Sequence, residues 1–173
     1  MSTRRNMPGA YGQNQPVGPS GERLCRWCRG LVPKGRRTYC SNDCVHEWRI
    51  RSDPGYLRHR VYQRDKGVCA KCGKDTDAMT RELSGLRRKS WLEWQKRRAE
   101  LGILGQRKTL WDADHITPVV EGGGECGLDG MRTLCLWCHK DETKALAGRL
   151  AKKKQTEDAQ KTTASEPGEI LTR

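Results

Sequence analysis

The chain has 173 residues, which is enough for one domain of ordinary size or for two small modules. A formal net charge of +13 indicates a polyanionic partner, most often nucleic acid, with a basic but merely solvated surface as the alternative. The sequence contains neither an apolar run of membrane-spanning length nor a signal-peptide pattern at its start. We therefore expect a cytoplasmic protein, nucleoid-associated or, in a eukaryote, nuclear.

Nine cysteines compensate for a thin apolar core. Phe is absent and the mean hydropathy is −0.91, so apolar burial alone would stabilise the fold weakly. In a reducing compartment, paired cysteines are better interpreted as metal ligands than as disulfides. The odd count fits two four-cysteine sites plus Cys126, whose simplest interpretation is a packed thiol without a role.

The N-terminal third predicts a leader and a small zinc module. Residues 1–20 are rich in Pro and Gly without an apolar period, which indicates a disordered leader. Residues 21–53 are predicted to form an N-terminal zinc module with four cysteine ligands, in which Ser41 can cap a short helix reaching Ile50.

Residues 54–150 are predicted to form the main domain. Asp53-Pro54 is a helix start and Lys66-Gly67 its end. A basic helical insertion follows at about 79–104, weakened in its middle by Gly85, and a short strand is expected over 110–116. The last helix is expected over Lys140–Leu150, and residues 151–173 are expected to be a disordered polar tail.

The cysteine spacings predict two structural zinc ions. Two knuckles far apart in sequence commonly enclose one tetrahedral zinc, and four thiolates leave no open position for catalysis. The two predicted ligand sets are Cys25, Cys28, Cys40 and Cys44, and Cys69, Cys72, Cys135 and Cys138. Cys135-x2-Cys138-His139 also matches the haem-attachment pattern of c-type cytochromes, but that chemistry needs export, and a partner pair of cysteines favours zinc.

Three segments carry a family resemblance. They are YCSNDCVHEWRIRS from Tyr39, YLRHRVYQRDKGVCAKC from Tyr56, and DADHITPVVEGGGECGLDGMRTLCLWCHKDET from Asp112. On these segments the chain resembles the HNH nuclease family, and within it the nuclease domains attached to annealing helicases. The resemblance implies a small zinc-stapled α+β protein, with a ββα-metal, treble-clef-like HNH domain preceded by a short zinc-knuckle module.

By this resemblance, the chain is expected to be a metal-dependent endonuclease that hydrolyses DNA. Asp114 and His139 would each give one ligand to a catalytic Mg²⁺ or another divalent ion, and His115 would be the general base. The chain departs from the family at Leu128-Asp129-Gly130-Met131, where Gly130 replaces the middle Asn of the motif. A zinc-dependent nucleic-acid-binding module with an impaired nuclease centre is therefore the alternative function, and RNA is not excluded as its partner.

Basic residues are expected to contact phosphates. Trp91 and Trp94, which lie among them, are expected to pack rather than to stack on bases. A solvated helix face is the alternative for the basic segment. The candidate phosphate contacts are Arg87, Arg88, Lys89, Arg97, Arg98, Arg132 and Lys140.

Overall fold

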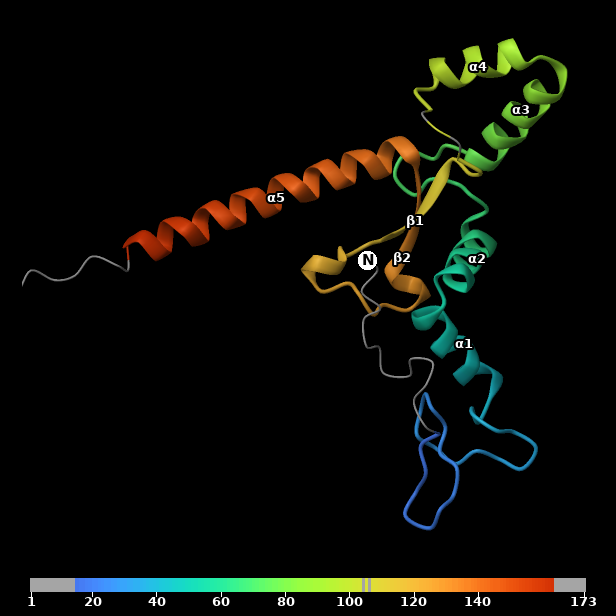
Figure 1. Cartoon of the computed structure of the whole chain (residues 1–173), viewed down its shortest axis with the longest axis vertical. Helices are drawn as coiled ribbons and strands as arrows, with labels where there is room; N and C mark the ends of the chain where they lie inside the picture. Colours follow the sequence, from blue (N-terminus) through green and yellow to red (C-terminus); the bar gives the residue numbers. More distant parts are fainter. Residues whose placement is uncertain (1–14, 104, 106, 164–173) are drawn as a thin grey trace, which may run out of the picture.

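The computed structural model describes residues 15–103, 105 and 107–163. Its centre is a two-stranded antiparallel sheet of β1 (Trp111–His115) and β2 (Met131–Cys135), followed directly by α5 (Leu136–Thr163), as Figure 1 shows. This ββα arrangement, with two four-cysteine clusters, confirms the predicted α+β fold class. The terminal parts of the predicted leader and tail, residues 1–14 and 164–173, lie outside the described residues.

Two capped helices precede the sheet. In α1 (Asn42–Ser52) the Ser41 side chain accepts a hydrogen bond from the backbone N–H of Cys44, which is the predicted N-cap. In α2 (Pro54–Asp65) the Asp53 side chain caps the N–H of Tyr56, and Lys66 ends the helix in the left-handed conformation. Both helix starts and the end of α2 lie where the sequence predicts them.

Helix α2 packs on one face of the hairpin. Val61 is fully buried against Trp111 of β1 and Met131 of β2. At the end of the helix, the Asp65 carboxylate accepts hydrogen bonds from the backbone N–H and the hydroxyl of Thr133, at 3.1 and 2.9 Å. Because side chains alternate along a strand, Asp112 and Asp114 then lie on the opposite face, toward α5.

The basic insertion is two helices, α3 (Thr76–Lys89) and α4 (Trp91–Glu100). The break falls at Ser90. Its backbone N–H donates a hydrogen bond to the carbonyl of Leu86 and ends α3, and its hydroxyl accepts one from the backbone N–H of Glu93 and caps α4. Gly85, where the sequence suggested weakness, is helical. Leu83 packs with Leu110, which precedes β1, and this contact joins the insertion to the hairpin.

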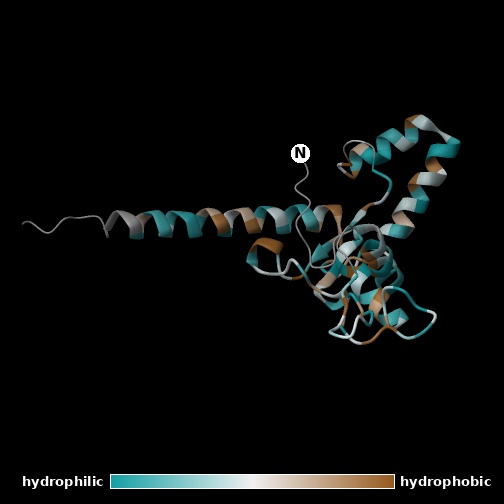
Figure 2. Cartoon of the chain, turned by 60° about the horizontal axis from the view of Figure 1, so that its bottom comes forward, coloured by the Kyte–Doolittle hydropathy of each residue, from teal (hydrophilic) through white to brown (hydrophobic). Residues whose placement is uncertain are grey.

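Helix α5 extends beyond its predicted end at Leu150 and continues to Thr163, where the sequence had indicated a disordered tail. Residues 151–160 are all exposed, and Figure 2 shows the helix projecting from the body of the molecule as a rod. Among the described residues, no helix combines the length and apolar character that crossing a membrane requires.

The N-terminal module begins before its predicted start at Gly21. Val17 forms an isolated antiparallel bridge with Arg23, and Leu24 forms another with Leu31. The side-chain amide of Gln15 donates a hydrogen bond to the carbonyl of Leu24. Residues 15–20 are thus part of the module, not of a leader.

Candidate active site and metal clusters

The structure brings together both predicted cysteine sets. In each, the four Sγ atoms lie within 4.8 Å of one another. We call them the N-terminal cluster (Cys25, Cys28, Cys40 and Cys44) and the central cluster (Cys69, Cys72, Cys135 and Cys138). A tetrahedron with Zn–S bonds of about 2.3 Å has edges of about 3.8 Å, and the Sγ atoms of Cys72 and Cys135 are 3.7 Å apart. The clusters therefore fit zinc, and their ligand types and spacing support two structural ions.

Backbone N–H groups favour the thiolate form at the first cysteine of each cluster. Burial raises the pKa of Cys25, but N–H groups of Cys28, Cys40 and Trp27 outweigh it and lower the pKa to about 6. Cys69 shows the same balance and a pKa of about 6. N–H groups directed at a thiolate are the surroundings that a zinc knuckle needs.

On the α5 face of β1, two carboxylates flank one imidazole. His139 lies in the first turns of α5, with its Nδ1 3.4 Å from Asp112 Oδ2 and its Nε2 3.8 Å from Asp114 Oδ1. With Nδ1 protonated toward Asp112, Nε2 keeps its lone pair on the Asp114 side. Sequence reasoning missed Asp112, although the Asp-Ala-Asp alternation in a strand places both carboxylates on one face.

Arginines hold both carboxylates. Arg132, directly opposite Asp114 across the hairpin, places its Nη2 at 2.9 Å from Asp114 Oδ2. Arg107 Nη2 donates to both oxygens of Asp112, at 2.7 and 2.9 Å. One oxygen of Asp114, Oδ1, is left facing His139, so the arginines orient the carboxylates without occupying that side.

The same face opens into a cavity of about 280 Å³, which contains the predicted base. His115 is the last residue of β1, and the chain bends at residues 116–117 directly after it. His115 thereby lines the same cavity as its neighbour Asp114 and as His139. Glu142, one turn further along α5, also lines it; a hydrogen bond from Lys71 lowers the pKa of Glu142.

The donor set fits one divalent cation. Two ligand atoms bound to the same Mg²⁺ at about 2.1 Å are at most about 4.2 Å apart, and Asp114 Oδ1 and His139 Nε2 are 3.8 Å apart. An imidazole nitrogen and a carboxylate oxygen, with the cavity open beside them, leave room for water and phosphate oxygens as further ligands.

The predicted phosphate contacts are spread over the molecule. Arg132 is bound to Asp114 on the α5 face of β1, and Arg97 pairs with Glu82 and Glu100. Arg87 and Arg98 line a second cavity, between α3 and α4. The other candidates, Arg88, Lys89 and Lys140, are exposed and line neither cavity.

Gly130 lies close to the base. Its carbonyl accepts a hydrogen bond from the N–H of Ile116, the residue after His115, at 2.9 Å. A Cβ at Gly130 would lie 2.4 Å from Cys126 Cβ and 2.8 Å from Cys126 Sγ. The neighbouring cysteine thus occupies the space that any side chain at residue 130 would enter.

Comparison with known proteins identifies the family to which this part of the chain is related. A profile of the HNH endonuclease family matches residues 102–145, which include β1, β2 and His139. The chain contains an HNH endonuclease domain. The mouse (Mus musculus) protein "DNA annealing helicase and endonuclease ZRANB3" is 35% identical to it over 154 residues, covering 76% of this chain and 14% of the relative.

The human (Homo sapiens) protein of the same name is 30% identical over 182 aligned positions, covering 94% of this chain and 16% of the relative. The crystal structure of the human ZRANB3 HNH domain is 29% identical, with a TM-score of 0.43, and the match covers 60% of this chain and 97% of that one. The HNH domain described here is thus related to that of ZRANB3. The chain spans less than a fifth of the length of these curated relatives.

Proposed function

We propose that the chain is a metal-dependent endonuclease that hydrolyses DNA phosphodiester bonds. The observation that carries the proposal is the meeting of Asp114 and His139, 3.8 Å apart, with His115 in one cavity. This arrangement joins a cation site to a proton acceptor, the two functions that hydrolysis of a phosphodiester requires.

His115 is the general base in this proposal. A neutral imidazole accepts a proton from water near neutral pH. His115, the last residue of β1 before the bend, lines the same cavity as the proposed cation ligands, which supports this role. Asp114 and His139 would hold a divalent ion, which when bound neutralises charge on the phosphate and assists the leaving oxygen.

Asp112 is a positioning residue in the same proposal. Its carboxylate is held by Arg107 and faces Nδ1 of His139 at 3.4 Å. A hydrogen bond donated by Nδ1–H to this carboxylate would fix the tautomer in which Nε2 is free to bind a cation. Asp112 thus acts through His139 and not on the substrate.

DNA is the proposed partner. The net charge of +13 favours a polyanion, and family membership favours DNA. Arg88, Lys89 and Lys140 are exposed cationic side chains that can contact phosphates without reading bases.

A plasmid-nicking assay with added Mg²⁺ or Mn²⁺, or with EDTA, tests this function. The parent should nick only with a divalent ion, and His115→Ala should abolish nicking while zinc content and thermal melting stay unchanged. His59→Ala is the matched control, because His59 is an exposed histidine of α2 that does not line the cavity. Equal activity of His115→Ala and the parent would refute the assignment of the base.

The second candidate is a zinc-dependent DNA-binding module with an impaired nuclease centre. Gly130, which stands where the family motif has Asn, favours it. A folded parent that binds DNA but does not nick it, whichever divalent ion is added, would support this candidate over the first.

A further inference from the structure

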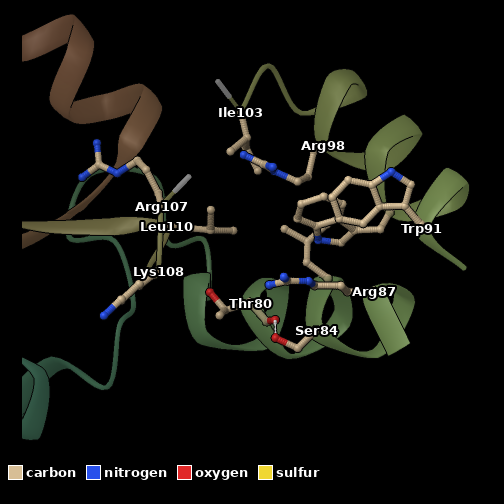
Figure 3. A pocket seen from close by; sticks show the side chains of 11 residues that line it. Thr80, Ser84, Arg87, Trp91, Arg98, Ile103, Arg107, Lys108 and Leu110 are labelled. Carbon is tan, nitrogen blue, oxygen red and sulfur yellow. Dashed lines mark hydrogen bonds between the residues drawn. The ribbon is translucent and has the colours of Figure 1, made fainter. Parts of the chain in front are cut away.

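A second cavity lies at the other end of β1, between α3 and α4. Figure 3 shows that α3, α4 and the chain before β1 each contribute side chains to it. Its volume is about 420 Å³, which lies in the range of pockets for small ligands. Its lining has an apolar part, with Leu83, Ile103 and Leu110, an aromatic part and a cationic part.

The aromatic part is a pair of tryptophans. The ring centroids of Trp91 and Trp94 are 4.5 Å apart, with the planes inclined by 33°. Trp94 also carries the guanidinium of Arg98 at 4.5 Å and that of Arg87 at 5.4 Å from its centroid. Trp94 thus contacts Trp91 and two guanidinium groups, whereas Trp91 is 56% exposed. The expectation that both tryptophans pack fits Trp94 better than Trp91.

Arg107 is the cation in the lining that binds a carboxylate, Asp112. Among the described residues, no carboxylate forms an ion pair with Arg87, Arg98 or Lys108. Arg97, which precedes Arg98 on α4, does pair with Glu82 and Glu100, and it lies outside the cavity lining. The cations beside the tryptophans are therefore the ones left for an external anion.

The cavity and the proposed catalytic cavity can serve one nucleic acid strand. Leu110 lines the first and His115 the second, and five strand residues at about 3.3 Å each separate them by about 17 Å. Arg107 lines the α3–α4 cavity and binds Asp112, which faces His139 of the proposed catalytic cavity. A chain of side-chain contacts thus connects the two cavities.

We propose that the α3–α4 cavity binds an unpaired nucleobase of the DNA substrate, with the base stacked on Trp91 and its flanking phosphates held by Arg87, Arg98 and Lys108. This inference rests on the proposed function for the identity of the polymer. In a duplex the base faces are covered by their neighbours, so an exposed indole beside cations that have no carboxylate partner suits an unpaired nucleotide. Stacking does not distinguish bases, so sequence selectivity is not expected.

Binding of two labelled DNA probes, oligothymidylate and a blunt duplex, tests the proposal. The full chain is used without added divalent ion, so binding is measured apart from cleavage. Trp91→Ala should weaken oligothymidylate binding about 5- to 100-fold, the range for loss of one stacked base. Duplex binding should change by no more than about twofold, because phosphate contacts remain.

Two further variants complete the test. Leu92→Ala is the matched control, because Leu92 is 74% exposed next to Trp91 and does not line the cavity; it should bind both probes like the parent. Trp91→Phe keeps an aromatic face and should retain most of the oligothymidylate affinity, which a role in folding alone would not predict.

Unchanged oligothymidylate binding by Trp91→Ala would overturn the proposal, and so would equal losses on both probes. If the parent nicks plasmid and Trp91→Ala binds oligothymidylate as well as the parent does, the cavity proposal is refuted and the nuclease function stands. If the parent binds oligothymidylate through Trp91 but does not nick plasmid, the nuclease function is refuted and the cavity proposal stands.

Discussion

Gly130→Asn should destabilise the fold before any gain in catalysis is seen. The new Cβ would lie 2.4 Å from Cys126 Cβ, and both atoms belong to side-chain stems that cannot rotate away. Cys126 is itself held, with its Sγ 3.5 Å from Met131 Sδ beside the core of α2 and the hairpin. Overpacking of this kind costs about 1–3 kcal/mol, so we expect that loss in the free energy of unfolding.

Cys126→Gly removes both clashing atoms and provides the second arm of a double-mutant cycle. In that background Gly130→Asn should cost no more than about 0.5 kcal/mol, giving a favourable coupling of about 1–3 kcal/mol. Urea unfolding at constant free zinc measures all four proteins. Gly148→Asn is the matched control, because a Cβ at Gly148, on α5, meets nothing within 4 Å.

The double variant also tests whether an Asn at residue 130 would brace the loop that carries His115 by hydrogen-bonding across it. If a missing brace near His115 slows the enzyme, the Cys126→Gly, Gly130→Asn protein should nick DNA about 10- to 100-fold faster than Cys126→Gly alone. Gly130→Asn as stable as the parent would refute the packing argument. A folded double variant that is no faster would show that the base is oriented by another route.

Four shorter predictions follow from the site. Elemental analysis should find two zinc ions per chain, and one ion or none would contradict the cluster assignment. DNA affinity should fall steeply as salt rises, and a flat response would contradict phosphate-dominated binding. Asp112→Asn should lower the nicking rate about 10- to 100-fold and raise the Mg²⁺ requirement at unchanged melting; a change in melting alone would make Asp112 structural. Hydrogen bonds from Arg64 and Thr133 hold the pKa of the Asp65 carboxyl below its ordinary value. Its contribution to stability is therefore complete above that ordinary value and is lost as the pH falls through the lowered pKa. In Asp65→Asn the free energy of unfolding should therefore fall less steeply with acidification than in the parent. The same dependence on acid pH in both proteins would contradict this prediction.

Local signals were the most predictable part of the fold. Ser41 and Asp53 cap their helices as expected, because a cap depends on a side chain and the N–H groups two or three residues away. The metal clusters were predictable for a similar reason, since spacing alone defines a knuckle. The helix break at Ser90 was not predicted, because Gly85 offered a competing weak point in the same segment.

Features that depend on contacts between residues distant in the sequence, or on helix propensity without a buried face, could not be predicted from the sequence. Asp112 could not be assigned to the site from the sequence, because its role depends on the distant His139, whose Nδ1 it faces only in the folded chain. The end of α5 was placed at Leu150, where the apolar side chains stop, but the following Ala, Lys, Gln and Glu residues favour helix without a buried face. The contact between Cys126 and Gly130 is visible only once the turn is folded.

The two cysteine clusters differ in how far apart their knuckles lie along the chain, and this difference orders metal uptake during folding. Cys28 and Cys40 are separated by 12 positions, whereas Cys72 and Cys135 are separated by 63. With a closure entropy that grows as (3/2)RT ln n, the longer loop costs about 1.5 kcal/mol more, or about tenfold in affinity for an unfolded chain. The N-terminal cluster should thus capture zinc first. The central cluster should fill only when the hairpin forms, and so its metal reports on assembly of the catalytic face.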